Sequence, residues 1–226
     1  MLRISFLHNF RTAIAIPTRQ PLIKSVSHSI KAHTTSNSSS TRHQDRALVS
    51  SNQEGDVYVV TLKTDPAHQK RMSELRAQYF PPHLLKVNAH ITLFHALPDS
   101  LKSTITSDLL SLCAAIRPFG IRAVKPFRIA RGVGFSVSGL GPAEALFAQL
   151  QKRWWEYLTP QDRRKFRGHY TLMNKVDDRE TVERCLKELA SDFEGCGGLA
   201  TGLDLWRYDR GWWRHEGDFE VSGASI

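Results

Sequence analysis

Two four-residue segments of this chain read His-x-Thr-Leu, and each lies in a run of residues that favour β-strands. They occupy positions 90–93 and 169–172, and are 79 residues apart. The pattern around them predicts the same order of elements twice, namely strand, helix, motif-bearing strand, helix and strand. A chain that alternates helices and strands in two similar halves is expected to adopt an α+β fold.

The expected elements follow from hydrophobic periodicity and from the positions of Gly, Pro and capping residues. The first half is predicted to hold a strand at 56–62, a helix at 66–78, the motif strand at 90–97 and a helix at 100–116. Two strands within 120–140 should meet near Arg131-Gly132, and the second half should begin near Phe135. It is completed by a helix at 143–158, the second motif strand at 169–176, a helix at 178–193, and a hairpin of 199–208 with 212–221.

The motifs fit the chemistry of phosphodiester cleavage, most of all in RNA or a nucleotide. Alternate residues of a strand point to the same face, so His90 and Thr92 share one face, as do His169 and Thr171. Cleavage requires one proton to be removed from the attacking oxygen and another to be given to the leaving oxygen, and two imidazoles can divide these tasks. The Thr hydroxyls can donate hydrogen bonds to the non-bridging oxygens. This scheme requires no metal ion or cofactor.

A single His-x-Thr is weak evidence, because a chain with ten histidines contains such a match by chance. His33-Thr34-Thr35 is one example, in a Ser-rich part of the chain. The other two segments differ because each is followed by Leu, lies in a predicted strand, and occupies the same place in its half. We therefore predict that they form one active site.

The paired motifs resemble the signatures of the two-histidine (2H) phosphoesterase superfamily, which includes 2′-5′ RNA ligase-like proteins and cyclic phosphodiesterases. The resemblance covers residues 51–226, and it is specific only in the motifs and their spacing. It implies a bilobal, pseudo-two-fold α+β fold, with two antiparallel sheets, outer helices and a central groove. It also implies metal-independent hydrolysis of 2′,3′-cyclic phosphates or 2′-5′ linkages, with His90, Thr92, His169 and Thr171 as catalytic residues.

Four further residues are candidates for binding the substrate. Arg131 and Arg167 each lie next to a glycine and could hold a phosphate, although either could equally be a solvated arginine. Arg167 ends the basic run 163–167, which resembles a phosphate-binding patch with an aromatic residue in it. Phe94 has the parity of the His face and could stack on a base or form the edge of the core. Tyr58 lies on a strand that could border the groove.

Other residues suggest sites less clearly. Trp154 fits the core face of its helix, and we expect the remaining tryptophans to close the terminal hairpin against the body of the protein. His83 and His95 flank the first motif, but no acid or cysteine completes a zinc site. The three cysteines are widely spaced and predict neither a disulfide framework nor a metal site, which favours a reducing compartment.

The first fifty residues are predicted to be a targeting segment and linker. Residues 1–44 contain no acid but several Arg and Lys, and apolar residues recur at helical spacing up to Pro17. This composition is typical of a mitochondrial transit peptide; a disordered basic tail in a cytoplasmic protein is the alternative. No stretch is apolar enough to span a membrane. The net charge of +9 favours an anionic partner such as nucleic acid.

Three functions remain open from the sequence. The first is hydrolysis of RNA ends or small cyclic nucleotides. The second is a nucleotide- or RNA-binding module that has lost catalysis, and the third is an exonuclease that trims RNA 3′ ends with the same site. We expect a monomer, and the sequence does not say which histidine is the acid and which the base.

Overall fold

The computed structural model describes residues 55–223 of the chain. The predicted transit segment and linker lie outside these residues, so the targeting function and the mitochondrial location stay predictions. Within the described part, no helix is both long enough and apolar enough to cross a lipid bilayer.

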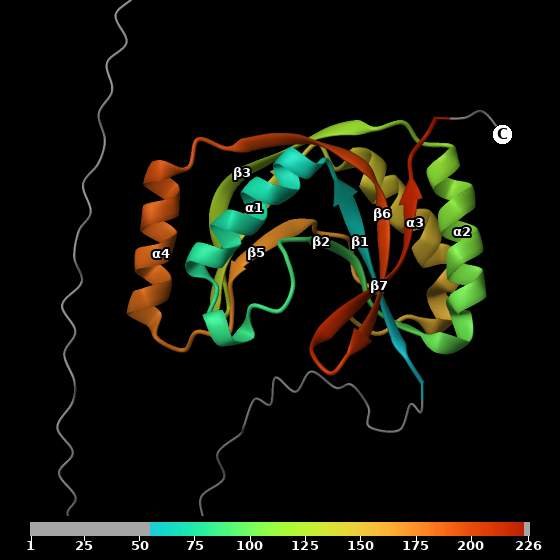
Figure 1. Ribbon diagram of the computed structural model, residues 1–226, viewed down its shortest axis with the longest axis horizontal. Coiled ribbons are helices and arrows are strands. Elements are labelled where there is room, and N and C mark those ends of the chain that lie inside the picture. Colours follow the sequence, from blue (N-terminus) through green and yellow to red (C-terminus); the bar gives the residue numbers. More distant parts are fainter. Residues whose placement is uncertain (1–54, 224–226) are drawn as a thin grey trace, which may run out of the picture. The chain divides into compact units, whose positions relative to one another are not determined.

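Within residues 55–223, seven strands and four α-helices follow one another in the order that the sequence predicts (Figure 1). Strand, helix, motif strand, helix and strand occur twice, first as β1-α1-β2-α2-β3 and then as β4-α3-β5-α4-β6, and β7 closes the chain. The strands are β1 (Val57–Thr64), β2 (Ile91–Pro98), β3 (Phe119–Ile129), β4 (Gly132–Ser138), β5 (His169–Met173), β6 (Cys196–Asp209) and β7 (Trp212–Glu220).

The strands form a single antiparallel sheet in the order β2-β1-β6-β3-β4-β5, with β7 paired to β6. The two halves of the sheet are equivalent, because β1 pairs with the motif strand β2 and β4 pairs with the motif strand β5. The motif strands are therefore the two ends of this path. The α+β class and the two-fold repetition that the sequence predicts are confirmed.

The expectation of two separate sheets is wrong in one respect, because β6 joins the halves. Residues 196–200 of this strand pair with β3, and residues 200–208 pair with β1. At 14 residues, β6 is long enough to take part in both halves. The sequence predicts a shorter strand, 199–208, because the Gly-rich stretch 195–198 is typical of a break. In the structure only Gly195 lies outside the strand, and residues 196–198 belong to it.

The helices flank this sheet, with α4 and α2 at opposite ends of the view in Figure 1. Their ends follow the capping residues. Asp65 accepts a hydrogen bond from the backbone nitrogen of His68 (2.9 Å) at the start of α1, and Asp178 accepts from Glu180 and Thr181 at the start of α4. The helices are α1 (Pro66–Tyr79), α2 (Lys102–Ala114), α3 (Gly141–Trp154) and α4 (Arg179–Asp192).

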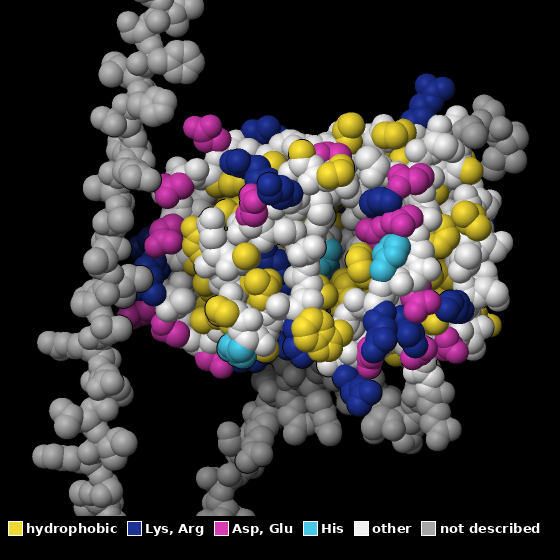
Figure 2. All heavy atoms as spheres, in the orientation of Figure 1, with side chains coloured by type: hydrophobic (Ala, Val, Ile, Leu, Met, Phe, Trp, Pro, Cys, Tyr) yellow, Lys and Arg dark blue, Asp and Glu magenta, His cyan; other side chains and the backbone are white. Residues whose placement is uncertain are grey.

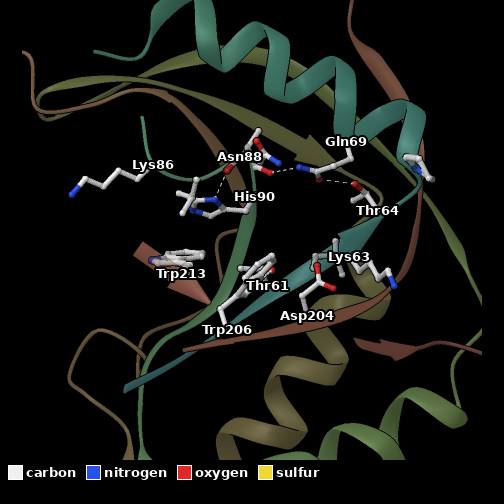
Figure 3. Close-up of a pocket in the computed structure, with 14 residues that line it drawn as sticks. Thr61, Lys63, Thr64, Gln69, Lys86, Asn88, His90, Asp204, Trp206 and Trp213 are labelled. Carbon is white, nitrogen blue, oxygen red and sulfur yellow. Dashed lines mark hydrogen bonds between the residues drawn. The ribbon is translucent and has the colours of Figure 1, made fainter. Parts of the chain in front are cut away.

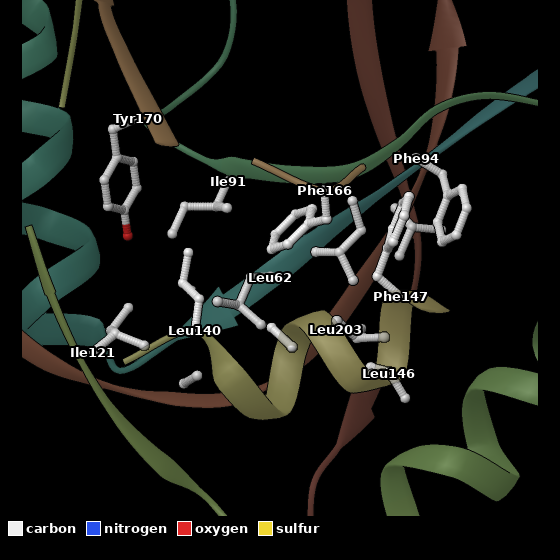
Figure 4. Close-up of a cluster of buried hydrophobic side chains, with 14 of the residues drawn as sticks. Leu62, Ile91, Phe94, Ile121, Leu140, Leu146, Phe147, Phe166, Tyr170 and Leu203 are labelled. Carbon is white, nitrogen blue, oxygen red and sulfur yellow. The ribbon is translucent and has the colours of Figure 1, made fainter. Parts of the chain in front are cut away.

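A continuous apolar core lies beneath both motif strands (Figure 4). Ile91 and Leu93 of the first motif are buried, and so are Tyr170 and Leu172 of the second. The alternation within each motif therefore separates core residues from the His and Thr residues, as the sequence predicts. This packing holds the functional face of each motif on a rigid strand.

Two glycines are required by the backbone. At Gly132 an added Cβ would lie 1.9 Å from the carbonyl oxygen of Met173, so only glycine lets β4 approach β5 this closely. In the terminal hairpin Arg210 and Gly211 have φ values of 46° and 94°. Two successive positive φ angles are typical of the tight turn that the Asp-Arg-Gly sequence predicts.

Candidate active site

Both motifs open into one groove of about 560 Å³. His90 and Thr92 line it from β2 and the residue before it, and His169 and Thr171 line it from β5. All four side chains are partly exposed, whereas their neighbours within the motifs are buried. The structure thus brings together the four residues that the sequence proposes as catalytic, from strands that are far apart along the sheet.

The two histidines are held by equivalent hydrogen bonds. Nδ1 of His90 lies 2.7 Å from the carbonyl oxygen of Asn88, and Nδ1 of His169 lies 2.8 Å from the carbonyl oxygen of Arg167. In each case the partner is the backbone two residues earlier. Because a carbonyl oxygen only accepts, Nδ1 carries the proton in both rings, and Nε2 of each neutral ring keeps its lone pair. Each imidazole can therefore exchange a proton through Nε2.

The environment of His90 favours its neutral form. Desolvation by burial is the largest cause, and the positive charges of Arg76, His95 and His169 act in the same direction, so the pKa of His90 falls to about 4. The hydrogen bond to the Asn88 carbonyl opposes this shift. At neutral pH His90 is therefore unprotonated and ready to accept a proton.

Arg76 connects the first half of the chain to the second motif. Its buried guanidinium, on α1, donates a hydrogen bond from Nη1 to the carbonyl oxygen of Thr171. β5 is the end strand of the sheet, so this bond satisfies a backbone group on its open edge. Nε of Arg76 has no hydrogen-bond partner in the described part of the chain. Burial lowers the Arg76 pKa to about 10, which still leaves the group charged at neutral pH.

Basic residues line one side of the groove, as the run 163–167 suggests. Arg164, Lys165 and Arg167 line it and are exposed, and Phe166 lies beneath them in the core. By contrast, positive and negative side chains are interspersed over the face shown in Figure 2. Of the two arginines proposed to bind phosphate, the structure places Arg167 in the groove.

The other proposed arginine lies elsewhere. Arg131 is in the turn before β4, where its guanidinium forms an ion pair with Asp177 at 2.6 Å. It does not line the groove. The neighbouring Gly132 reflects the close approach of β4 to β5. The expected position of Arg131 in the groove is therefore wrong, and the alternative, an exposed loop arginine, fits the structure.

Phe94 and Tyr58 are also wrongly predicted as groove residues, since both are buried. The Phe94 ring stacks on Phe147, with centroids 4.7 Å apart, and meets the edge of Trp154 at 5.0 Å. The Tyr58 hydroxyl donates to Asp99 at 2.9 Å. Both side chains belong to the core, as Trp154 does in agreement with its prediction.

A β-bulge explains the error at Phe94. Thr61 of β1 pairs with Thr92, but the next partners are Val60 and Phe94, so Leu93 is an extra residue in β2. Strand alternation therefore changes phase after Leu93, and both Leu93 and Phe94 are buried. A bulge has no reliable signal in a single sequence.

The same bulge brings His95 into the groove, a position that regular strand alternation does not predict. The buried Asp162 carboxylate accepts from Nδ1 of His95 at 2.8 Å and from the backbone nitrogens of His95 and Ala96. This acid fixes the bulged backbone and orients the third imidazole. The order of the residues gives no signal for this, since Asp162 is 67 positions away from His95.

Only one group of potential metal ligands occurs among residues 55–223. It comprises Asp204, His215 and Asp218 on β6 and β7, whose donor atoms lie within 4.8 Å of one another. The Lys63 ammonium contacts Asp218 at 2.9 Å and so already supplies a positive charge there. None of the three residues lines the groove between the motifs.

Comparison with known proteins agrees with this geometry. The model of the 2′-5′ RNA ligase superfamily matches residues 64–212. Similar solved structures include a phosphoesterase (TM-score 0.53, 16% identity, covering 75% of this chain and 99% of that one). Another is E. coli LigT complexed with 3′-AMP (TM-score 0.51, 19% identity, covering 75% and 99%). No curated protein sequence matches. The chain therefore belongs to the 2′-5′ RNA ligase superfamily, the two-histidine phosphoesterases that its motifs resemble.

Proposed function

We propose that this protein hydrolyses 2′,3′-cyclic phosphates or 2′-5′ linkages of RNA or nucleotides, with His90 as general base and His169 as general acid. The observation that carries this proposal is the equivalent placement of the two imidazoles. Each has Nδ1 fixed by a backbone carbonyl, and each lines the same groove with a Thr hydroxyl beside it.

The proposed reaction uses only groups of the chain and water. Nε2 of His90 takes a proton from a water molecule as its oxygen attacks phosphorus. The bond from phosphorus to the leaving sugar oxygen breaks, and Nε2 of protonated His169 gives that oxygen a proton. The hydroxyls of Thr92 and Thr171 donate hydrogen bonds to the non-bridging oxygens, where negative charge increases. The low pKa of His90 supports its assignment as the base.

The basic side of the groove favours RNA over a free cyclic nucleotide. Arg164, Lys165 and Arg167 could contact further phosphates of a chain whose end lies between the histidines. Because such a surface would also suit an enzyme that shortens RNA from its 3′ end, exonuclease activity is the alternative function of the same site.

A turnover assay in EDTA tests the proposal. The full chain is incubated with 2′,3′-cyclic nucleotides, an RNA that ends in a cyclic phosphate, a 2′-5′ linked dinucleotide, and an RNA with an unmodified 3′ end. We expect turnover of at least one of the first three substrates. The His90→Ala, His169→Ala double variant serves as the control and should be inactive on all of them.

The outcomes separate the three candidate functions. Progressive shortening of the unmodified RNA identifies an exonuclease. Nucleotide binding with no product from any substrate identifies the binding module and rejects hydrolysis. A parallel assay without EDTA completes the test, because turnover that occurs only without EDTA would contradict the metal-independent mechanism.

The pH dependence of kcat/KM should reflect the environment of His90. Because its pKa is about 4, the activity should persist well below the ordinary imidazole pKa of about 6.5 before the base becomes protonated. Arg76→Met removes a positive charge that disfavours the imidazolium form, so the pKa of His90 should rise. We therefore expect the acidic limb of the pH–rate profile to move to higher pH in this variant.

Arg71→Met is the matched control, since Arg71 lies on the same helix but is exposed. It should leave the acidic limb in place. A wild-type limb near pH 6.5, or no movement in Arg76→Met, would contradict the assignment of His90 as a base kept neutral by its surroundings. Circular dichroism confirms that both variants are folded before their profiles are compared.

A further inference from the structure

A second cavity, of about 470 Å³, adjoins the groove on the side of His90 (Figure 3). His90 and Trp213 line both the cavity and the groove, so the two spaces meet at the His90 side chain. The rest of the lining comes from β1, α1, the segment before β2, and the part of β6 that pairs with β1. The reaction proposed above gives this cavity no role.

Two indole rings form one wall of this cavity. Trp206 and Trp213 lie on paired strands with ring centroids 6.2 Å apart, and Figure 3 shows them on the same side. Nε1 of Trp206 donates to Oγ1 of Thr61 at 2.9 Å, and the Trp213 ring lies 4.5 Å from the His90 ring. These contacts fix both rings before any ligand binds.

The remaining lining is polar and partly preorganised. Nε2 of Gln69 donates to the carbonyl oxygen of Ala89 at 2.7 Å and to Oγ of Ser73 at 3.1 Å, which holds that side chain in place. The side chains of Asn88 and Asp204 line the cavity from opposite sides in Figure 3. A flat ligand with hydrogen-bonding edges matches such a cavity, whereas an aliphatic one would leave these polar groups unpaired.

We propose that this cavity binds the nucleobase of the substrate nucleotide while its phosphate lies between His90 and His169. The proposal rests on the function proposed above and adds a base-binding subsite to it. Every nucleobase has a flat face for the indole rings and polar atoms for Asn88 and Asp204. The shared lining by His90 and Trp213 gives the continuity that one nucleotide requires.

Packing of the hairpin alone does not account for this arrangement. Trp212, the neighbour of Trp213, is 58% exposed, so closing the hairpin against the body does not use every tryptophan. Successive residues of a strand point to opposite faces. Trp213 is thus on the cavity face. Trp212 does not line the cavity, although the ammonium of Lys86, which does, lies 5.3 Å from the centroid of its ring, so Trp212→Ala controls for the loss of an indole from this hairpin.

The test compares two substrates that react identically and differ only in the base. Adenosine 2′,3′-cyclic phosphate carries a base, and the 2′,3′-cyclic phosphate of 1-O-methyl ribose does not. In the full chain, Trp206→Ala and Trp213→Ala should each lower kcat/KM for the adenosine compound by about 10- to 100-fold. The base-free compound should react with Trp206→Ala at nearly the wild-type rate. Trp213 also lines the groove and packs on His90, so the effect of Trp213→Ala is read from the ratio of kcat/KM for the two substrates, which should fall. Trp212→Ala should leave this ratio unchanged.

Binding of adenosine, followed by quenching of tryptophan fluorescence, separates this subsite from the proposed reaction. Suppose that the protein shows no turnover, but adenosine quenches its fluorescence saturably, and that Trp213→Ala weakens this quenching whereas Trp212→Ala does not. This result would support the subsite and reject the reaction. Equal loss for both substrates in both cavity variants would overturn the subsite, because the tryptophans would then act only through His90 and the fold. Absence of adenosine binding to the wild type would overturn it as well.

Discussion

His90→Ala and His169→Ala should each lower kcat by about 10²- to 10⁴-fold, because each removes a proton acceptor or donor in the reaction. Both rings are only partly buried, and in each the side chain's hydrogen bond runs to a backbone carbonyl. Their replacement should therefore leave the free energy of unfolding nearly unchanged. Steady-state turnover of the preferred substrate, together with urea denaturation, measures the two effects separately.

His83→Ala is the matched control, since His83 is exposed and lies outside the groove. It should retain full activity. The double variant should be scarcely slower than either single variant, because acid and base act in one transition state and their losses do not add. Substantial turnover by both single variants would reject the two-histidine mechanism, whatever the stability of the proteins.

The motif pair was predictable because it combines two local signals that agree. The first signal is strand alternation, which places His and Thr on one face and the apolar residues Ile91, Leu93, Tyr170 and Leu172 on the other. The second is the repeated order of elements, which gives each motif the same position in its half of the chain. Neither signal depends on details of tertiary packing. The structure accordingly places the His and Thr of both motifs in one groove.

The residues around the motifs were less predictable, because they depend on contacts between distant segments. His95 reaches the groove through a bulge that Asp162 stabilises from 67 positions away. Arg76 reaches the backbone of Thr171 from 95 positions away. Periodicity describes neither contact, and a charge run such as 163–167 shows only that a basic surface exists, not where it lies.

The union of both halves in a single sheet was also hard to predict, because it too depends on contacts between distant segments. Its continuity depends on β6, which pairs with β1 on one edge and with β3 and β7 on the other. The glycines at 197 and 198 are typical of loops, yet pairing with Ile121 and Arg122 keeps them extended. Tertiary pairing thus overrides the local preference for a break, and it unites the halves that the sequence pattern separates.

Phe94→Ala should lower the free energy of unfolding by about 3 to 5 kcal/mol, which is a large part of the stability of a domain this size. The Phe94 side chain is fully buried, stacks on Phe147 and meets the edge of Trp154. Its removal leaves a cavity that the surrounding α3 and β2 can fill only in part. Urea denaturation followed by circular dichroism measures the loss, which should appear as a lower midpoint with an unchanged slope.

Two further variants make this result specific to the bulge. Phe94→Leu keeps most of the buried volume and should cost less than Phe94→Ala, whereas Tyr157→Ala removes an exposed ring and should change stability by less than about 0.5 kcal/mol. At a temperature where Phe94→Ala stays folded, its ratio of kcat/KM for base-bearing and base-free substrates should equal that of the wild type. Unchanged stability with a selective loss for base-bearing substrates would instead place Phe94 in the groove, and would mean that strand alternation continues unbroken past Leu93.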